Sequence, residues 1–292
     1  MGTKARAVTM NLTELAALFP DCSGLQSILV RTGQKEVVRA VQNQRAVAIK
    51  LFYKGADDQE RIDRELAAVT KLQCSFVPGV FASGQVTLEG VDRVYLIEEF
   101  IEGDTYSTIL QRTPVQSLHD VLDLANILLR VAVDCETAGL VHRDLKPANL
   151  IRDMAGKVWV LDFGFVRHID LSTVTPTGQG VGTLGYAPME QMRLLKAAID
   201  TRADIFAIGT ILYESLSGRN PWLDGTKDVH DLTRKMSTQE LPRLAIAGDV
   251  NGEFSSYLGW LTQRFPSRRP QSAAEALAAF EPIYRALTAP TP

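Results

Sequence analysis

The segment "LVHRDLKPANLIRD", residues 140–153, places five strongly polar side chains among apolar ones. Its histidine, arginine, aspartate, lysine and asparagine stand between Leu140, Val141, Leu145, Leu150 and Ile151. So many apolar residues are typical of a segment that packs into a core. Buried polar groups persist when they bond one another, bind an ion or take part in chemistry. We therefore expect this segment to carry the functional site.

The composition of the whole chain limits the classes of function. Its 292 residues suffice for one large domain or two closely joined lobes. A net charge of −3, from 31 basic and 34 acidic side chains, argues against a nucleic-acid partner. Apolar runs are far shorter than the ~20 residues of a membrane span, so we expect no membrane partner. Cys22, Cys74 and Cys135 are widely separated, which favours reduced thiols and a cytoplasmic location.

Hydrophobic patterning divides the chain into a β-rich part followed by a helical part. Short β-branched runs predict strands at residues 36–41, 45–52 and 92–103. Helical periodicity predicts helices at residues 57–72, from about 118 to 132, at 203–218 and at 272–287. The pattern indicates an α+β fold, with a ligand-binding cleft expected between a β-rich lobe and a helical lobe.

The polar residues of the opening segment combine with a second acidic position. A strand in "KVWVLDFGF", residues 157–165, ends at Asp162, so Asn149 and Asp162 flank a predicted β-hairpin. Carboxylate and amide oxygens at one point suit Mg²⁺. Lys146 adds a positive charge nearby, and Asp144 adds a carboxylate that can accept a proton. A metal site, a cation and a base together favour phosphoryl transfer.

These motifs resemble those of the eukaryotic-type serine/threonine protein kinase family, in the form found in bacteria. "HRDLKPAN" (142–149) is similar to its catalytic loop, "DFG" (162–164) to its magnesium motif and "VAIK" (47–50) to its third strand. The resemblance implies a bilobal kinase-like fold with one main helix in the N-lobe. It further implies an N-terminal extension (1–24), a kinase domain (25–285, with lobes of about 25–101 and 102–285) and a tail (286–292).

The resemblance also assigns roles to the site residues, with ATP and Mg²⁺ as cofactors. Asp144 would orient the substrate hydroxyl, and Lys146 would steady the γ-phosphate. Asn149 and Asp162 would hold Mg²⁺. Lys50 would contact the α- and β-phosphates and pair with a helix glutamate, Glu65. The remaining expected ATP-binding residues are Gly33, Val37, Ala48, Glu99, Ile101 and Ile151.

Two further segments resemble supporting parts of the family's C-lobe. "GTLGYAPMEQ" (182–191) supplies Glu190, which would pair with Arg269, and Asp204 would brace the catalytic loop. Arg143, beside the catalytic aspartate, indicates regulation through a phosphorylated activation loop. The candidate regulatory hydroxyl residues are Ser172, Thr173, Thr175, Thr177 and Thr183.

The chain departs from the family pattern at two places in its β-rich part. Val30, Thr32 and Lys35 stand where the phosphate-covering loop normally has glycines, and Gly33 lies between them. Glu98 replaces the apolar residue that usually precedes the hinge, and a carboxylate there needs a partner.

The expected function is ATP- and Mg²⁺-dependent phosphorylation of serine or threonine in protein substrates, with autophosphorylation of the activation loop and possible self-association for that reaction. The first alternative is a pseudokinase scaffold that binds nucleotide without turnover, which the glycine-poor loop favours. The second is a small-molecule kinase, a class that usually lacks a segment like "GTLGYAP". Transfer of label from ATP to a protein acceptor would distinguish the enzyme from the scaffold.

Overall fold

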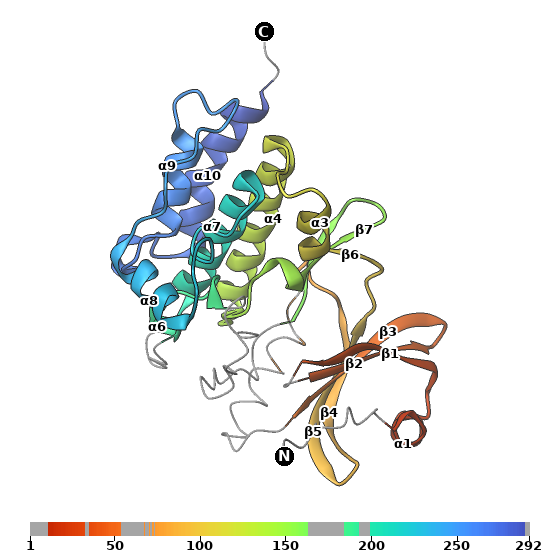
Figure 1. Ribbon diagram of the computed structural model, residues 1–292. Helices are drawn as coiled ribbons and strands as arrows, with labels where there is room; N and C mark the ends of the chain where they lie inside the picture. Colours follow the sequence, from red (N-terminus) through yellow and green to blue (C-terminus); the bar gives the residue numbers. More distant parts are fainter. Residues whose placement is uncertain are drawn as a thin grey trace. The chain divides into compact units, whose positions relative to one another are not determined.

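The structure is a computed structural model that describes residues 11–32, 35–53, 67, 70, 72, 74–162, 184–192 and 199–289. The chain divides into two compact units (Figure 1). The first comprises the chain up to Thr70 together with Pro78–Phe100, and the second comprises Lys71–Val77 and the chain from Ile101 onwards. The first unit is built on a sheet and the second is mostly helical, which confirms the α+β class. The predicted limits of the extension, lobes and tail stay predictions.

Five antiparallel strands form the sheet of the first unit, in the order β1-β2-β3-β5-β4. The predicted strands at 36–41 and 45–52 are confirmed as β2 and β3, whereas β1 and β4 were not predicted. The strands are β1 (Cys22–Thr32), β2 (Lys35–Gln42), β3 (Arg45–Tyr53), β4 (Val80–Leu88) and β5 (Val91–Glu99).

The predicted strand at 92–103 is wrong at its C-terminal end. β5 ends at Glu99, and Gly103 begins a separate strand, β6 (Gly103–Thr105), in the second unit. β6 pairs with β7 (Leu150–Asp153), which in turn pairs with β8 (Val158–Val160). A Cβ atom on Gly103 would overlap the carbonyl oxygen of Arg152, so only glycine permits this close backbone approach.

Two short hairpin turns fix the register of the sheet in the first unit. Asn43 and Gln44 between β2 and β3 have φ of 50° and 63°, and Glu89 and Gly90 between β4 and β5 have φ of 53° and 73°. Two left-handed residues in a row are typical of the two-residue turns whose twist matches that of antiparallel strands. The turns therefore set which side chains of β2, β3 and β5 share a face.

A short helix near the N-terminus completes the core of the first unit. α1 (Leu12–Leu18) begins at Asn11, whose side chain accepts the backbone N–H groups of Thr13 and Glu14. Leu15 is fully buried, and Phe19 meets the ring of Tyr95 edge-on at 5.0 Å. The other buried core residues are Cys22, Val38, Ala40, Val47, Ile49, Leu51, Leu88 and Ile97.

The core of the second unit surrounds α7 (Thr201–Ser217), which is buried on nearly every side. α7 contacts α4 (Leu118–Thr137), α9 (Glu253–Leu261) and α10 (Ala273–Thr288). A Cβ atom on Gly209 would lie 2.7 Å from Thr262, so glycine allows α7 and α9 to approach closely. Gly218 ends α7 in the left-handed conformation, as its position in the sequence predicted.

Among the described residues, the remaining helices of the second unit are short. α3 (Tyr106–Arg112) follows β6, α6 (Met189–Met192) precedes α7, and α8 (Val229–Thr238) follows it. Two single-turn 3₁₀ helices are η1 (Pro147–Asn149) and η4 (Pro266–Arg268). The helix predicted at 57–72 falls mostly outside the described residues. Within the part of the chain that is described, no helix is long and apolar enough to span a membrane.

Candidate functional site

The segment 140–149 connects α4 to β7 and is held down by its apolar side chains. Leu140, Leu145 and Leu150 are all buried, whereas the polar residues between them turn towards one another. Pro147 begins the single turn η1, because its ring fixes φ and removes a backbone donor. The alternation seen in the sequence therefore separates anchoring side chains from functional ones.

Asp144, Lys146 and Asn149 form one hydrogen-bonded cluster. Lys146 Nζ lies 3.1 Å from both carboxylate oxygens of Asp144. Asn149 Nδ2 donates to Asp144 Oδ2 at 2.9 Å and to the Asp144 carbonyl at 2.8 Å. These bonds fix the direction of the Asp144 carboxylate. They also use both hydrogens of the Asn149 amide, so Asn149 Oδ1 is the atom that can serve a ligand.

Asp162 follows Leu161, whose backbone N–H and carbonyl both bond to residues of segment 140–149. The N–H of Leu161 donates to the Asn149 carbonyl at 2.8 Å. The carbonyl of Leu161 lies 3.0 Å from His142 Nε2. Asp162 itself has φ of +63°, a left-handed conformation that non-glycine residues seldom adopt and that is often found at functional sites.

Asn149 and Asp162, the two residues expected to bind a metal, carry oxygen atoms that suit Mg²⁺ as ligands. Asn149 offers an amide oxygen, Asp162 a carboxylate, and the Leu161–Asn149 backbone bond links the two segments. Mg²⁺ prefers such hard oxygen ligands and keeps part of its water shell. The donor set therefore suits Mg²⁺ and would not suit a metal that prefers sulfur or imidazole.

Asp204, in the first turn of α7, holds the backbone of segment 140–149. Its Oδ2 accepts the backbone N–H of His142 at 2.7 Å, and its Oδ1 accepts that of Arg143 at 2.8 Å. Arg143 itself has φ of +63°, a left-handed conformation that non-glycine residues seldom adopt. Burial raises the pKa of Asp204 to about 6, although the two N–H bonds act in the opposite direction. Asp200, and not Asp204, caps the N-terminus of α7.

His142 is buried in its neutral form. Its Nε2 donates to the Leu161 carbonyl, and its Nδ1 accepts the N–H of Asp144 at 3.3 Å. Burial lowers the pKa of His142 from 6.5 to about 4. A proton on Nδ1 would remove the acceptor that the Asp144 N–H uses, so the neutral imidazole helps to hold the backbone of Asp144.

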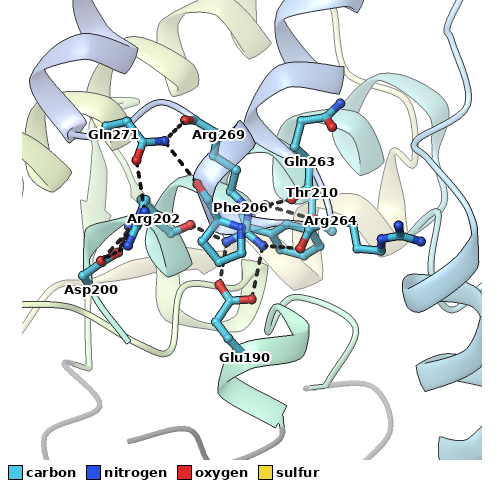
Figure 2. A network of polar contacts seen from close by, with 10 residues as sticks. Glu190, Asp200, Arg202, Phe206, Thr210, Gln263, Arg264, Arg269 and Gln271 are labelled. Atoms are coloured by element: carbon cyan, nitrogen blue, oxygen red, sulfur yellow. Dashed lines mark hydrogen bonds and ion pairs between the residues drawn. The ribbon is translucent and has the colours of Figure 1, made fainter. Parts of the chain in front are cut away.

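Arg269 lies at the centre of a second polar network in the helical unit (Figure 2). Its guanidinium pairs with Glu190 through two bonds of 2.6 and 3.2 Å, and its side chain is fully buried. The three remaining N–H groups donate to the backbone carbonyls of Gln263, Arg202 and Arg264. Because all five donors are satisfied, the buried charge is compensated, and residues near Glu190 are fixed to α7 and η4.

Residues 184–192, which include Glu190, also contact segment 140–149 directly. Gln191 Nε2 donates to the carbonyl of Arg143 at 2.6 Å. Tyr186 donates its hydroxyl to Glu214 of α7 at 2.5 Å. Leu184 and Met192 pack in a cluster with Phe206, Trp222, Leu232 and Met236. The polar and apolar contacts together hold residues 184–192 beside Arg143.

A sequence model described as the protein kinase domain matches residues 32–279 of the chain. The chain belongs to the protein kinase family. The match spans both compact units, and it includes every residue placed in the polar networks above.

Several curated relatives of this kinase chain are bacterial. Serine/threonine-protein kinase PknA of Mycobacterium tuberculosis is 32% identical over 205 residues, which cover 68% of this chain and 47% of PknA. PknL of the same organism is 29% identical over 273 residues, which cover 91% of this chain and 66% of PknL. The probable serine/threonine-protein kinase PknB of Corynebacterium glutamicum is 32% identical over 213 residues, 68% of this chain and 32% of PknB. The chain thus spans about half the length of PknA.

The sheet of the first unit carries four other residues that are expected to bind the nucleotide, which are Val37, Ala48, Lys50 and Glu99. Lys50 is buried and lies 2.5 Å from the carboxylate of Glu98. Ala48 is also buried, whereas Val37 is partly exposed and Glu99 is exposed. The N–H of Glu99 donates to the Gly79 carbonyl at 2.9 Å, so a backbone bond to a ligand there would have to use the Glu99 carbonyl.

Two expected adenine contacts belong to the second unit, and seven expected residues cannot be placed. Ile101 is buried, and Ile151 is partly buried in β7, opposite Thr105 of β6. The residues that lie outside the described part of the chain are Gly33, Glu65, Ser172, Thr173, Thr175, Thr177 and Thr183.

Sequence reasoning missed three polar residues of these networks. We assigned no role to His142 or Gln191, and we predicted no partner for Glu98. The position of His142 inside an apolar run was a usable signal for a buried imidazole. The partners of Gln191 and Glu98 depend on contacts between distant segments, which no local pattern reveals.

Replacing Arg269 with methionine should lower the free energy of unfolding by about 3–5 kcal/mol, because Glu190 would keep a buried charge without its partner. Arg285→Met is the matched control, since Arg285 forms an exposed pair with Glu281 and should change stability by less than about 1 kcal/mol. Urea unfolding of the three proteins measures both effects. Equal stability of the two variants would contradict the assigned role of Arg269.

The neutral state of His142 predicts a defined pH dependence of stability. Between about pH 6.5 and 4 the unfolded chain binds a proton at His142 that the folded protein excludes. The resulting contribution is fully present above pH 6.5 and is lost as pH falls through 4, by about 3 kcal/mol in total. Asp204 has the opposite slope between pH 3.8 and 6, because its folded-state pKa is raised.

The His142→Gln variant removes this contribution while its amide keeps one donor and one acceptor. Its free energy of unfolding should therefore fall less steeply than that of the original protein when pH is lowered from 6.5 to 4. Taking the difference between the two proteins cancels the slope from Asp204. His119→Gln, at an exposed histidine, is the control for the loss of a histidine side chain. Parallel profiles for His142→Gln and the original protein would show that His142 is not buried neutral.

Proposed function

We propose that this chain is a protein serine/threonine kinase that transfers the γ-phosphoryl group of MgATP to hydroxyl groups of protein substrates. The observation that carries the proposal is the cluster of Asp144, Lys146 and Asn149, held on Asp204. Membership in the protein kinase family supports it, and so do the relatives, whose names describe serine/threonine kinases.

We assign each residue of the cluster a role in the transfer. The Asp144 carboxylate is fixed by donors from Lys146 and Asn149, and it would accept the proton of the attacking hydroxyl. The oxygen of that hydroxyl then bonds to the γ-phosphorus while the bond from phosphorus to the leaving oxygen of ADP breaks. Lys146, 3.1 Å from the same carboxylate, would offset negative charge on the transferred group.

The nucleotide and its metal ion would be held by the residues that the family resemblance assigns to them. Lys50 would bind the α- and β-phosphates, and Asn149 with Asp162 would hold Mg²⁺. The ion would supply a charge that binds and orients the phosphates. The carbonyl of Glu99, with Ile101, Ala48 and Ile151, would bind adenine.

Regulation and cellular context extend the proposal. We expect autophosphorylation of at least one of Ser172, Thr173, Thr175 and Thr177, with Arg143 binding the phosphate and self-association bringing two chains together. Cys22, Cys74 and Cys135 are all free thiols, which suits a reducing cytoplasm.

Incubation with labelled ATP, Mg²⁺ and a generic acceptor protein tests the proposal. Label should appear on the acceptor, and Asp144→Asn should reduce its rate of appearance at least about 100-fold by removing the proton acceptor. Asp224→Asn, at an exposed carboxylate paired with Arg219, is the control and should retain full activity. Mass spectrometry of the same reaction should locate phosphate between residues 165 and 181.

Nucleotide binding without any transfer of label would contradict the proposal and favour the scaffold. Transfer to a small alcohol or aminoglycoside, but to no protein, would favour the small-molecule kinase.

A further inference from the structure

Two charged side chains on one face of the sheet form a buried ion pair. Lys50 Nζ in β3 lies 2.5 Å from Glu98 Oε1 in β5, and their side chains are 4% and 8% exposed. Removing two charges from water is costly unless they are closely paired. The contact therefore explains how a carboxylate is tolerated where an apolar side chain was expected.

The strand register explains why these two residues meet. Lys50 is opposite Leu96, and Ala48 is opposite Glu98. Because opposite residues of antiparallel strands point to the same face, and alternate residues share it, Lys50 and Glu98 are diagonal neighbours.

A second buried ion pair lies on the opposite face of the same sheet. Glu36 of β2 and Arg93 of β5 are 2.8 Å apart, with side chains 5% and 2% exposed. Glu36 is opposite Leu51, which belongs to the apolar core of the unit. The face with Lys50 instead carries Val37 and Ala48, which the kinase resemblance places against the nucleotide. The two ion pairs are thus similarly buried. Glu36–Arg93 faces the apolar core, whereas Lys50–Glu98 faces the residues that the resemblance places against the nucleotide.

We propose that Glu98 is a positioning residue that holds the Lys50 ammonium group for the nucleotide phosphates. The inference rests on the proposed function, because it assumes that Lys50 binds these phosphates. A lysine ammonium has three N–H donors, so the bond to Glu98 does not by itself exclude phosphate contacts. Both residues lie on strands joined by a continuous ladder from Val47 to Tyr53, which fixes the carboxylate relative to the lysine.

The family resemblance implies a helix glutamate, here Glu65, as the partner of Lys50, and Glu65 lies outside the described residues. Glu98 supplies a counter-charge from inside the sheet. The position of the ammonium group then depends on the β3–β5 ladder in addition to any helix. A buried ammonium group that loses its fixed counter-charge can release its proton or turn away, and either change weakens its attraction for phosphate.

Calorimetric titration with MgADP tests the inference without depending on turnover. Glu98→Gln keeps the size of the side chain and removes its charge, and it should weaken MgADP binding at least about tenfold. Glu98→Met, which needs no hydrogen-bond partner, provides a second variant and should weaken binding similarly. Glu36→Gln is the matched control, since it should lower stability and leave the affinity for MgADP unchanged.

A double-mutant cycle shows whether Glu98 acts through Lys50. In a Lys50→Met background the Glu98→Gln change should have no further effect on MgADP affinity. An equal loss in both backgrounds would overturn the inference, because Glu98 would then act on the nucleotide independently. Unchanged or tighter binding by both Glu98 variants would overturn it as well.

Measurements on the original protein show whether only the role of Glu98 is wrong or the proposed function is wrong as well. If it binds MgADP and phosphorylates protein while both Glu98 variants bind equally well, only the role of Glu98 is rejected. If it neither binds MgADP nor transfers phosphate, both proposals are rejected.

Discussion

The two hydrogen bonds that the Asp204 carboxylate accepts are the interaction on which the arrangement of segment 140–149 depends. The carboxylate accepts the N–H groups of His142 and Arg143 at 2.7 and 2.8 Å from within the buried helix α7. These bonds compensate part of the cost of burying the carboxylate and fix the backbone immediately before Asp144. The orientation of the proposed proton acceptor is therefore set from the centre of the helical unit.

The same helix anchors the segment that precedes it. Arg269 donates to Glu190 and to the carbonyl of Arg202 in the first turn of α7. Gln191, next to Glu190, reaches back to the carbonyl of Arg143. Polar groups near the N-terminus of α7 thus hold segment 140–149, and Arg269 and Gln191 join residues 184–192 to the same region. Such fully bonded polar networks specify one arrangement more strictly than apolar packing does.

Local sequence patterns predicted the features that depend on local rules. Alternation predicted β2 and β3, helical periodicity predicted α4 and α10, and Gly218 marked the end of α7. The cluster of Asp144 with Lys146 and Asn149 was predictable because its members lie within six residues of one another. The polar content of β1 and β4 hid these strands, since they lack a clear alternating pattern.

Contacts between distant segments could not be predicted in the same way. The ion pair of Lys50 with Glu98 depends on the register of β3 against β5. The ion pair of Glu36 with Arg93 depends on two registers, that of β2 against β3 and that of β3 against β5. A shift of one residue would move every side chain of a strand to the other face. The sequence therefore indicated that Glu98 needed a partner, whereas only the fold identifies it.

The central claim is that the polar residues between His142 and Asp162 are retained because they hold a metal-bound nucleotide. Calorimetric titration of ADP with and without Mg²⁺, for the original protein and for Asp162→Ala, measures this most directly. The account predicts that Mg²⁺ tightens ADP binding to the original protein and has little effect on the variant. Equal tightening by Mg²⁺ in both proteins would contradict it.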